Sequence, residues 1–282
     1  MHEPPIQQIV CCMGQPVTGN PSQFMMERAF AAAHLDWRYL TLEIAPENLG
    51  DAVRGMRAMG FRGGNFTLPH KVAVIEHLDR LSEAAELMGA VNCVSIEEGT
   101  LIGENTDGKG FVESLRQITD PAGKRVALFG AGGAARAIAV ELALAGTESI
   151  TVINRTRERG ESLVALLKER IEIPSEFILW DSEIEIPADA DVVINGTSIG
   201  LGDQQARLPI VADSFDPRQV VADVVFNPVQ TRFLQEATER GCKTLDGLGM
   251  LVNQGVIGFR IWTGVEPDRA VMREAIEEFL EV

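Results

Sequence analysis

A short apolar segment that ends in a glycine-rich turn constrains the fold of this chain more than any other feature. The apolar residues 126–129 run directly into Gly130-Ala131-Gly132-Gly133-Ala134-Ala135, and an alanine-rich stretch continues from there. A buried strand, a Gly-x-Gly-x-x-Ala turn and a helix form the start of a dinucleotide-binding unit, in which backbone N–H groups at the helix N-terminus bind a pyrophosphate. The segment therefore predicts a Rossmann-like domain.

The residues after the next predicted strand indicate which dinucleotide binds. That strand, over residues 149–153, ends in Asn154-Arg155-Thr156-Arg157 and not in Asp or Glu. An acidic side chain at this place would accept a hydrogen bond from a ribose 2′-hydroxyl, whereas a pair of guanidinium groups with neighbouring amide and hydroxyl donors suits a 2′-phosphate. The sequence thus predicts NADP as the cofactor.

The composition limits the partners of this chain. Its 25 basic and 41 acidic residues leave a formal charge of −16, which argues against nucleic acid or an anionic membrane as a partner. The local run of Arg155, Arg157 and Arg159 stands out against this acidic background. No apolar run reaches the roughly 20 residues of a membrane-spanning helix, so we expect a cytoplasmic protein. The four cysteines lack Cys-x-x-Cys spacing, and we expect reduced thiols and no metal site.

The order of the predicted elements indicates an α/β protein. Residues 6–68 alternate strand-like and helix-like segments, and a helix is predicted over residues 72–87. Two short strands then turn at residues 97–99, and a second alternating series begins near residue 126. This order implies mainly parallel sheets with helical crossovers.

Two domains are the expected division of this chain. Two amphipathic helices close the sequence, and their length suits packing against the first domain. We therefore expect a discontinuous substrate-binding and catalytic domain over residues 1–107 and 249–282, and a Rossmann-like NADP-binding domain over residues 108–248. The active site would lie in the cleft between the two domains.

Lys71 and Asp107 are the candidates for acid-base chemistry. Hydride transfer from NADP to a carbonyl group requires a proton donor beside the carbonyl oxygen. Lys71 follows Pro69, where a predicted strand stops, and Asp107 stands just before a predicted helix. A lysine near a carboxylate in a cleft makes a workable acid-base pair. Taken alone, however, Lys71 is better explained as a solvated lysine at a helix start, and Asp107 as a helix cap.

Seven segments resemble the shikimate dehydrogenase family in order and spacing, over nearly the whole chain. They are Gly64-Asn65-Phe66-Thr67-Leu68-Pro69-His70-Lys71, Gly89-Ala90-Val91-Asn92, Asn105-Thr106-Asp107-Gly108, Gly130-Ala131-Gly132-Gly133-Ala134, Asn154-Arg155-Thr156, Asn195-Gly196-Thr197-Ser198 and Asp246-Gly247-Leu248-Gly249-Met250-Leu251-Val252-Asn253-Gln254. The resemblance implies an NADP-dependent, reversible reduction of 3-dehydroshikimate to shikimate, a step of chorismate and aromatic amino-acid biosynthesis. It also implies Lys71 as the catalytic acid-base residue and Asp107 as its partner.

The same resemblance implies the residues that bind the substrate and the cofactor. The substrate would be contacted by Asn20, Ser22, Thr67, Asn92, Phe226 and Gln254. The cofactor would be held by Gly130, Ala131, Gly132, Gly133, Ala134, Asn154, Arg155, Thr156, Arg159, Val224 and Gly247. The expected partner is a small-molecule substrate, and the expected assembly is a monomer or a homodimer.

Two of these positions depart from the family pattern. Asn20 stands where the family has the first of two serines that bind the substrate carboxylate, and Ser22 matches the second. Phe226 stands where the family places a tyrosine, and the lost hydroxyl removes a hydrogen bond worth about 0.5–1.5 kcal/mol. A related cyclic polyol or quinate therefore stays open as the substrate. A non-catalytic NADP-binding regulator is a further alternative. The presence of both Lys71 and Asp107 argues against it.

Overall fold

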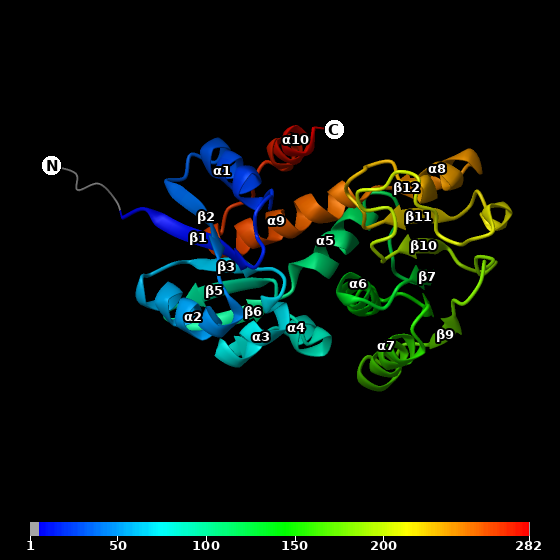
Figure 1. Cartoon of the computed structure of the whole chain (residues 1–282), viewed down its shortest axis with the longest axis horizontal. Coiled ribbons are helices and arrows are strands. Elements are labelled where there is room, and N and C mark those ends of the chain that lie inside the picture. Colours follow the sequence, from blue (N-terminus) through cyan, green and yellow to red (C-terminus); the bar gives the residue numbers. More distant parts are fainter. Residues whose placement is uncertain (1–5, 282) are drawn as a thin grey trace. The chain divides into compact units, whose positions relative to one another are not determined.

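The computed structural model describes residues 6–281, and their contacts separate into two compact units (Figure 1). Unit 1 contains the described residues up to Thr106 together with Gly255–Glu281, and unit 2 contains Asp107–Gln254. Helix α9 (Gly247–Thr263) begins in unit 2 and ends in unit 1. Within residues 6–281, no helix is long and apolar enough to cross a membrane.

Unit 1 is built on a mixed sheet. Its described strands are β1 (Gln8–Gly14), β2 (Trp37–Glu43), β3 (Gly63–Phe66), β4 (Arg80–Leu81), β5 (Cys93–Glu97) and β6 (Thr100–Glu104), in the spatial order β2-β1-β3-β5-β6-β4. Strands β2, β1 and β3 run parallel, as expected, whereas β5 is antiparallel to both of its neighbours. Glu98 and Gly99 have φ angles of 49° and 81°, and two consecutive positive φ angles are typical of the two-residue hairpin turn that reverses the chain here.

Helices cover both faces of the unit 1 sheet. They are α1 (Ser22–Ala32), α2 (Leu49–Ala58), α3 (His70–Ala73), α4 (Glu83–Met88) and α10 (Arg269–Leu280), with the 3₁₀ turns η1 (Pro46–Asn48) and η2 (Val74–His77). Figure 1 shows α2, α3 and α4 on one side of this sheet and α1 and α10 on the other. Val53 of α2 and Ala85 of α4 belong to the same buried cluster as Met13 and Phe66 of the sheet.

The helix predicted over residues 72–87 is wrong. Arg80–Leu81 leaves the helical path and pairs in parallel with β6. The Asp79 carboxylate accepts a hydrogen bond from the backbone N–H of Leu101 (2.8 Å), and Ser82 then caps a separate helix, α4. Pairing with a strand about twenty residues away in the sequence therefore overrides the local helical pattern.

Unit 2 has the doubly wound arrangement of a dinucleotide-binding domain, which confirms the predicted Rossmann-like fold. Its residues are all described, and its strands are β7 (Arg125–Phe129), β8 (Ser149–Asn154), β9 (Ser175–Leu179), β10 (Val192–Asn195), β11 (Val220–Asp223) and β12 (Lys243–Leu245). They stand in the order β12-β11-β10-β7-β8-β9, and every neighbouring pair is parallel. The helices of this part of the chain are α5 (Thr106–Leu115), α6 (Gly133–Leu144), α7 (Arg157–Arg170) and α8 (Arg232–Glu239), with the 3₁₀ turn η3 (Ala212–Ser214). Because the strand order reverses between β7 and β10, a ligand crevice is expected at the carboxyl ends of these two strands.

Both faces of the unit 2 sheet are buried, which explains why β7 reads as an unbroken apolar run. Val126 and Leu128 belong to a core cluster with side chains of α5, α6 and α7. Ala127 and Phe129, which point to the opposite face, belong to a second cluster with side chains of α8. The strands form a packed support, so the residues that follow their carboxyl ends are the ones placed for binding.

Candidate functional site

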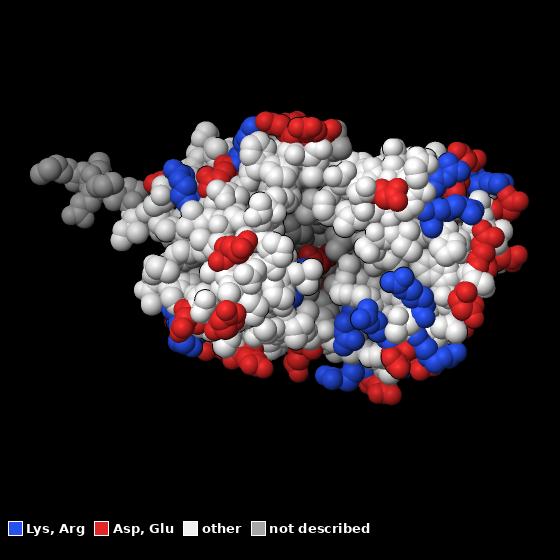
Figure 2. Space-filling view, viewed as in Figure 1, with Lys and Arg blue, Asp and Glu red and all other residues white. Residues whose placement is uncertain are grey.

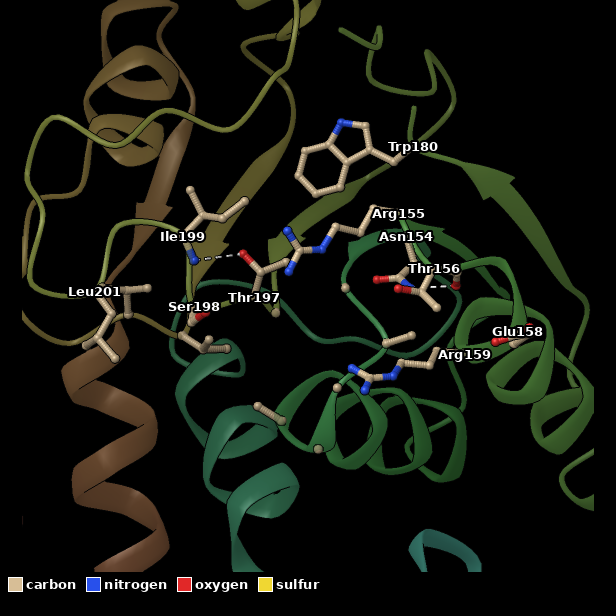
Figure 3. Close-up of a pocket in the computed structure, with 18 of the residues that line it drawn as sticks. Asn154, Arg155, Thr156, Glu158, Arg159, Trp180, Thr197, Ser198, Ile199 and Leu201 are labelled. Carbon is tan, nitrogen blue, oxygen red and sulfur yellow. Dashed lines mark hydrogen bonds between the residues drawn. The ribbon is translucent and has the colours of Figure 1, made fainter. Parts of the chain in front are cut away.

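A cavity of about 760 Å³ opens at the carboxyl ends of β7, β8, β10 and β11 in unit 2 (Figure 3). Its volume lies in the range of small-molecule and cofactor sites. Its walls come from residues 130–134, 154–156, 196–199 and 224–226, with Glu158, Arg159, Trp180 and Leu201. The fold thus brings all of the expected cofactor-binding residues except Gly247 to one cavity.

The glycine-rich turn forms an open cradle at the start of α6. At Gly132 and Gly133 nothing lies within 4 Å of the position that a Cβ atom would take, so the backbone borders open space there. Gly130 has a φ angle of 110°, and a Cβ atom on it would lie 3.0 Å from the backbone oxygen of Gly196. The first N–H groups of α6 receive no side-chain cap from Gly132. A pyrophosphate fits such a cradle, because it accepts hydrogen bonds from these N–H groups and is favoured by the positive end of the helix dipole.

Two guanidinium groups extend into this cavity, Arg155 from the end of β8 and Arg159 from the first turn of α7 (Figure 3). Both side chains are exposed, and neither forms an ion pair with a described residue. Figure 2 shows Lys and Arg side chains gathered on unit 2 over α6 and α7. The two groups are therefore available to an anionic ligand on a chain that is acidic overall.

The Asn154-Arg155-Thr156-Arg157 pattern suggested Arg157 as a second guanidinium, but the structure does not bring Arg157 to the cavity. Its Nη1 lies 3.1 Å from Oε1 of Glu161, its guanidinium lies over the ring of Phe177, and it does not line the cavity. Residues two apart on a helix point in nearly opposite directions, so Arg157 and Arg159 could not both face the cavity. The pair consists of Arg155 and Arg159.

Asn154 and Trp180 shape the same wall of the cavity. The Asn154 side-chain amide donates to the backbone oxygen of Thr156 (2.8 Å), which organises the loop that carries Arg155. Trp180, which sequence reasoning missed, donates from Nε1 to the backbone oxygen of Pro209 (3.2 Å) and is itself buried. Its place directly after the apolar strand β9 is the signal that could have identified it, because this strand neighbours β8.

Thr197, Ser198, Ile199 and Leu201 line the opposite side of the cavity, and sequence reasoning assigned them no role (Figure 3). The Thr197 hydroxyl accepts a hydrogen bond from the N–H of Ile199 (3.1 Å), so this loop is internally braced. The Asn195-Gly196-Thr197-Ser198 segment was the available signal for the first two of them.

A buried carboxyl group supports the cavity floor. Asp223, at the end of β11, accepts hydrogen bonds from the Thr231 hydroxyl (2.6 Å), the Asn195 side-chain amide (2.9 Å) and the N–H of Val225 (2.9 Å). Burial raises the pKa of Asp223 to about 6, although these donors act in the opposite direction. The network holds the segment that carries the cavity residues Val224 and Phe226.

Gly247 borders the same segment from behind. A Cβ atom on this glycine would lie 2.4 Å from the backbone oxygen of Val225 and 2.6 Å from that of Val224. Any larger residue would push this segment out of place. Gly247 therefore acts by permitting a close backbone approach.

Lys71 lies in the short helix α3 of unit 1, and its side chain is partly buried. Its backbone oxygen accepts a hydrogen bond from the N–H of Val91 (2.8 Å), which ties α3 to the segment before β5. Burial raises the pKa of the Cys12 thiol to about 11, while a hydrogen bond with Tyr39 and the charge of Lys71 lower it. The charge of Lys71 therefore influences the Cys12 thiol of β1.

Asn20 lies beside the same thiol, and Ser22 is bonded to Asn20. The Asn20 side-chain oxygen accepts from the N–H of Ser22 (2.9 Å), and its Nδ2 donates to Sγ of Cys12 (3.6 Å). Ser22 is buried and begins α1. Thr67, at the end of β3, is tied to β1 because its N–H donates to the backbone oxygen of Met13 (2.9 Å). Asn20 and Thr67 are thus both held against β1, the strand whose Cys12 thiol the charge of Lys71 influences.

Asn92 anchors the start of helix α5. Its Oδ1 accepts from the N–H of Thr106 (2.7 Å), and its Nδ2 donates to the Thr106 hydroxyl (3.0 Å). Asp107 is the next residue along the chain and lies in the first turn of this helix. In unit 2, the buried Gln254 donates from Nε2 to the backbone oxygen of Leu251 (2.9 Å). Among residues 6–281, no group of three or more His, Cys, Asp or Glu residues is arranged to hold a metal ion.

Three family models match this chain. Residues 12–94 match the shikimate dehydrogenase substrate binding domain, residues 113–201 match shikimate / quinate 5-dehydrogenase, and residues 247–277 match the shikimate 5'-dehydrogenase C-terminal domain. The three matches follow one another along the chain without overlap.

Relatives and solved structures agree with these models. The shikimate dehydrogenase (NADP(+)) of Moorella thermoacetica is 42% identical, with 96% of this chain and 92% of the relative covered. The ligand-free 5-ketofructose reductase of Gluconobacter sp. strain CHM43 is 51% identical with a TM-score of 0.95, covering 96% of this chain and 98% of that one. The Thermus thermophilus shikimate 5-dehydrogenase, solved with NADP(H) and shikimate, is 36% identical with a TM-score of 0.83, covering 97% and 100%. The chain therefore belongs to the shikimate dehydrogenase family.

Proposed function

We propose that this chain is an NADP-dependent oxidoreductase that interconverts a ketone and a secondary alcohol, with 3-dehydroshikimate and shikimate as the first candidate pair. One observation carries the proposal: Arg155 and Arg159, neither ion-paired with a described residue, lie over a glycine cradle in a chain whose curated relatives are named NADP-dependent shikimate dehydrogenases. Two guanidinium groups and no carboxylate at the end of β8 favour a 2′-phosphate over a bare ribose.

Different groups of cavity residues would contact different parts of the cofactor. Residues 130–134 would hold the pyrophosphate, Arg155 and Arg159 the 2′-phosphate, and Asn154 and Thr156 the loop beneath it. Val224 would border the nicotinamide, and Gly247 would let the segment that carries Val224 take its position. Bound NADPH supplies a hydride to the carbonyl carbon of the substrate.

Lys71 is the proposed proton donor. Charge develops on the carbonyl oxygen as the carbon is reduced, and an ammonium group beside that oxygen stabilises the charge and delivers the proton. In the reverse direction the neutral amine accepts the hydroxyl proton. Asp107 is the proposed partner of Lys71 in this transfer. Thr67, Asn92 and Gln254 are the proposed ligands of the substrate hydroxyl groups.

The test is an assay of the purified protein with NADPH and 3-dehydroshikimate. We expect loss of the reduced-nicotinamide absorbance, and no such loss with Lys71→Ala. The variant should still bind NADPH, because Lys71 lies outside the cofactor cavity. Lys168→Ala is the matched control, since Lys168 is exposed in the last turn of α7, and it should retain full activity. Normal turnover by Lys71→Ala would refute the assignment.

Reduction of 5-ketofructose is the second candidate, and two observations favour it. The solved structure of a 5-ketofructose reductase is 51% identical to this chain, against 42% for the Moorella thermoacetica shikimate dehydrogenase. Asn20 and Phe226 also replace residues with which the family contacts the substrate carboxylate end. The acid-base chemistry at Lys71 serves both substrates, so assaying 5-ketofructose and 3-dehydroshikimate in parallel decides between them.

A further inference from the structure

Helix α3 carries Lys71 but is too short to hold its own position. It contains only the four residues His70–Ala73, and an isolated helix of fewer than about 12 residues is not stable in water. All four residues are described, and His70 is the one that is buried, at 1% exposure, whereas Val72 is 65% exposed. The side chain of His70 is therefore the one that packs fully into unit 1.

The imidazole of His70 bonds to the chain directly after β2. Its Nε2 lies 2.8 Å from the backbone oxygen of Ile44. A carbonyl oxygen can only accept a hydrogen bond, so Nε2 carries a proton and donates it. Because His70 is buried, a side chain without this donor would leave the Ile44 oxygen facing an apolar group. Such an unpaired polar group costs more than the hydrogen bond itself contributes.

This bond closes a ring of contacts across the ends of three adjacent strands. The N–H of Ile44 donates to the backbone oxygen of Gly14, at the end of β1 (3.0 Å). The N–H of Gln15, the next residue, donates to the backbone oxygen of Leu68, between β3 and α3 (2.9 Å). His70 follows two residues later and returns to Ile44 through its side chain. The position of α3 relative to the sheet of unit 1 is thus set by a closed circuit that includes one side chain.

The other printed bonds around α3 come from the backbone. The N–H of His70 donates to the backbone oxygen of Thr67 (2.8 Å), and the backbone oxygen of Lys71 accepts from the N–H of Val91 (2.8 Å). These bonds do not depend on which side chain stands at position 70. A substitution of His70 therefore opens the circuit and leaves them in place.

We propose that His70 is a positioning residue for Lys71, because its bond to Ile44 fixes α3 and thereby directs the Lys71 ammonium group to the carbonyl oxygen of the substrate. The inference rests on the proposed function, in which Lys71 is the proton donor. Proton delivery requires a heavy-atom distance of about 2.6–3.2 Å between donor and oxygen. A small shift of α3 would therefore slow the chemical step without removing any group that binds the cofactor.

The main variant is His70→Phe, which keeps a planar ring and removes the donor. It is assayed with NADPH and with whichever of 3-dehydroshikimate and 5-ketofructose the wild type reduces. We expect kcat to fall by about 10- to 100-fold, the effect of a misplacement of about 1 Å in a catalytic geometry. KM for the ketone should change much less, because the proposed substrate ligands are unaltered. Affinity for NADPH, followed by nicotinamide fluorescence, should be unchanged because the cofactor cavity lies in unit 2.

His70→Gln is the conservative variant. The amide nitrogen of glutamine stands as far along the side chain as Nε2 of histidine and can donate to the same carbonyl, so most of the wild-type kcat should return. His70→Met also lacks the donor, and its flexible side chain fills the site if the phenylalanine variant melts at too low a temperature. His34→Asn is the matched control, because His34 is exposed just after α1 in the same unit, and it should retain full activity.

An isotope effect separates positioning from folding. A partly unfolded sample contains fewer active molecules, which lowers kcat but leaves unchanged the effect of deuterating the transferred hydrogen of NADPH. Product release limits many enzymes, so a displaced Lys71 that slows the chemical step should raise the isotope effect on kcat. The expected result is a larger isotope effect in His70→Phe than in the wild type, and a return toward the wild-type value in His70→Gln.

The possible failures are distinguishable. Full activity of His70→Phe, a loss that His70→Gln shares, or an unchanged isotope effect would each overturn this inference and leave the proposed function intact. Normal turnover by Lys71→Ala would instead refute the proton donor on which the inference rests. Absence of NADPH oxidation by the wild type with either ketone would refute the proposed function.

Discussion

Replacing Arg155 by alanine should convert this chain from an NADP-preferring protein to one that distinguishes the two cofactors weakly. Arg155 points into the cavity, is exposed, and has no ion-pair partner among residues 6–281. Its loss therefore breaks no ion pair or side-chain hydrogen bond with a described residue and leaves no buried charge. A hydrogen bond to a charged group contributes about 1.5–3 kcal/mol, which corresponds to a loss of about 10- to 150-fold in affinity for NADPH. Because the side chain is exposed, the lower end of this range is expected.

The measurement is a fluorescence titration of the wild type and variants with NADPH and with NADH. Affinity for NADH should change little, since it has no 2′-phosphate. Arg157→Ala is the matched control, because this neighbouring arginine pairs with Glu161 outside the cavity. The difference between wild type and Arg155→Ala should also shrink as salt concentration rises. Equal losses for Arg155→Ala and Arg157→Ala, or an unchanged preference in the first, would refute the phosphate site.

Two predictions concern stability. Burial raises the pKa of Asp223 from the ordinary 3.8 to about 6 in the folded state. The stability that the protonated Asp223 contributes is therefore complete below pH 3.8 and is lost as pH rises through 6. This change lowers the free energy of unfolding by about 3 kcal/mol. Urea unfolding between pH 4 and 7 should therefore show a flatter pH dependence for Asp223→Asn than for the wild type, and parallel curves would contradict the buried-carboxyl account. Gly160→Ala should lower the free energy of unfolding by about 1–3 kcal/mol, because its Cβ atom would lie 2.2 Å from the ring of Phe177. Gly55→Ala, with its nearest neighbour at 3.7 Å, is the control and should be neutral or slightly stabilising in thermal melts.

The parts of the fold and site that could be predicted are those carried by contiguous residues. The turn from Gly130 to Ala134 needs only its own backbone and the strand before it, and the structure places it at the start of α6 as expected. The hairpin at residues 97–99 likewise depends on two positive φ angles within the turn. In both cases the physical requirement lies within a few residues, so the sequence pattern is sufficient.

The errors arose where residues outside a short motif, or the path of a helix, decide the outcome. The helix predicted over residues 72–87 gives way because Arg80–Leu81 pairs with β6. Arg157 was paired with Arg155 from their proximity in sequence, but helix geometry turns Arg157 toward Phe177 and brings Arg159 to the cavity. Trp180 was missed because a tryptophan after a strand carries no motif of its own.

The amino-acid sequence by itself determined the dinucleotide-binding fold and the class of cofactor, since each is encoded in a short segment with its own geometric requirement, whereas Lys71 became the candidate acid only through the family resemblance. Only the tertiary structure decided which loops and which arginines meet at the cofactor cavity. Residues 130–134, 154–156, 196–199 and 224–226 lie at the ends of four separate strands, and they meet only when the sheet of unit 2 has formed. The carboxyl ends of parallel strands lie at one edge of a sheet, so the strand order, and not the sequence of any one segment, decides which residues share the cavity.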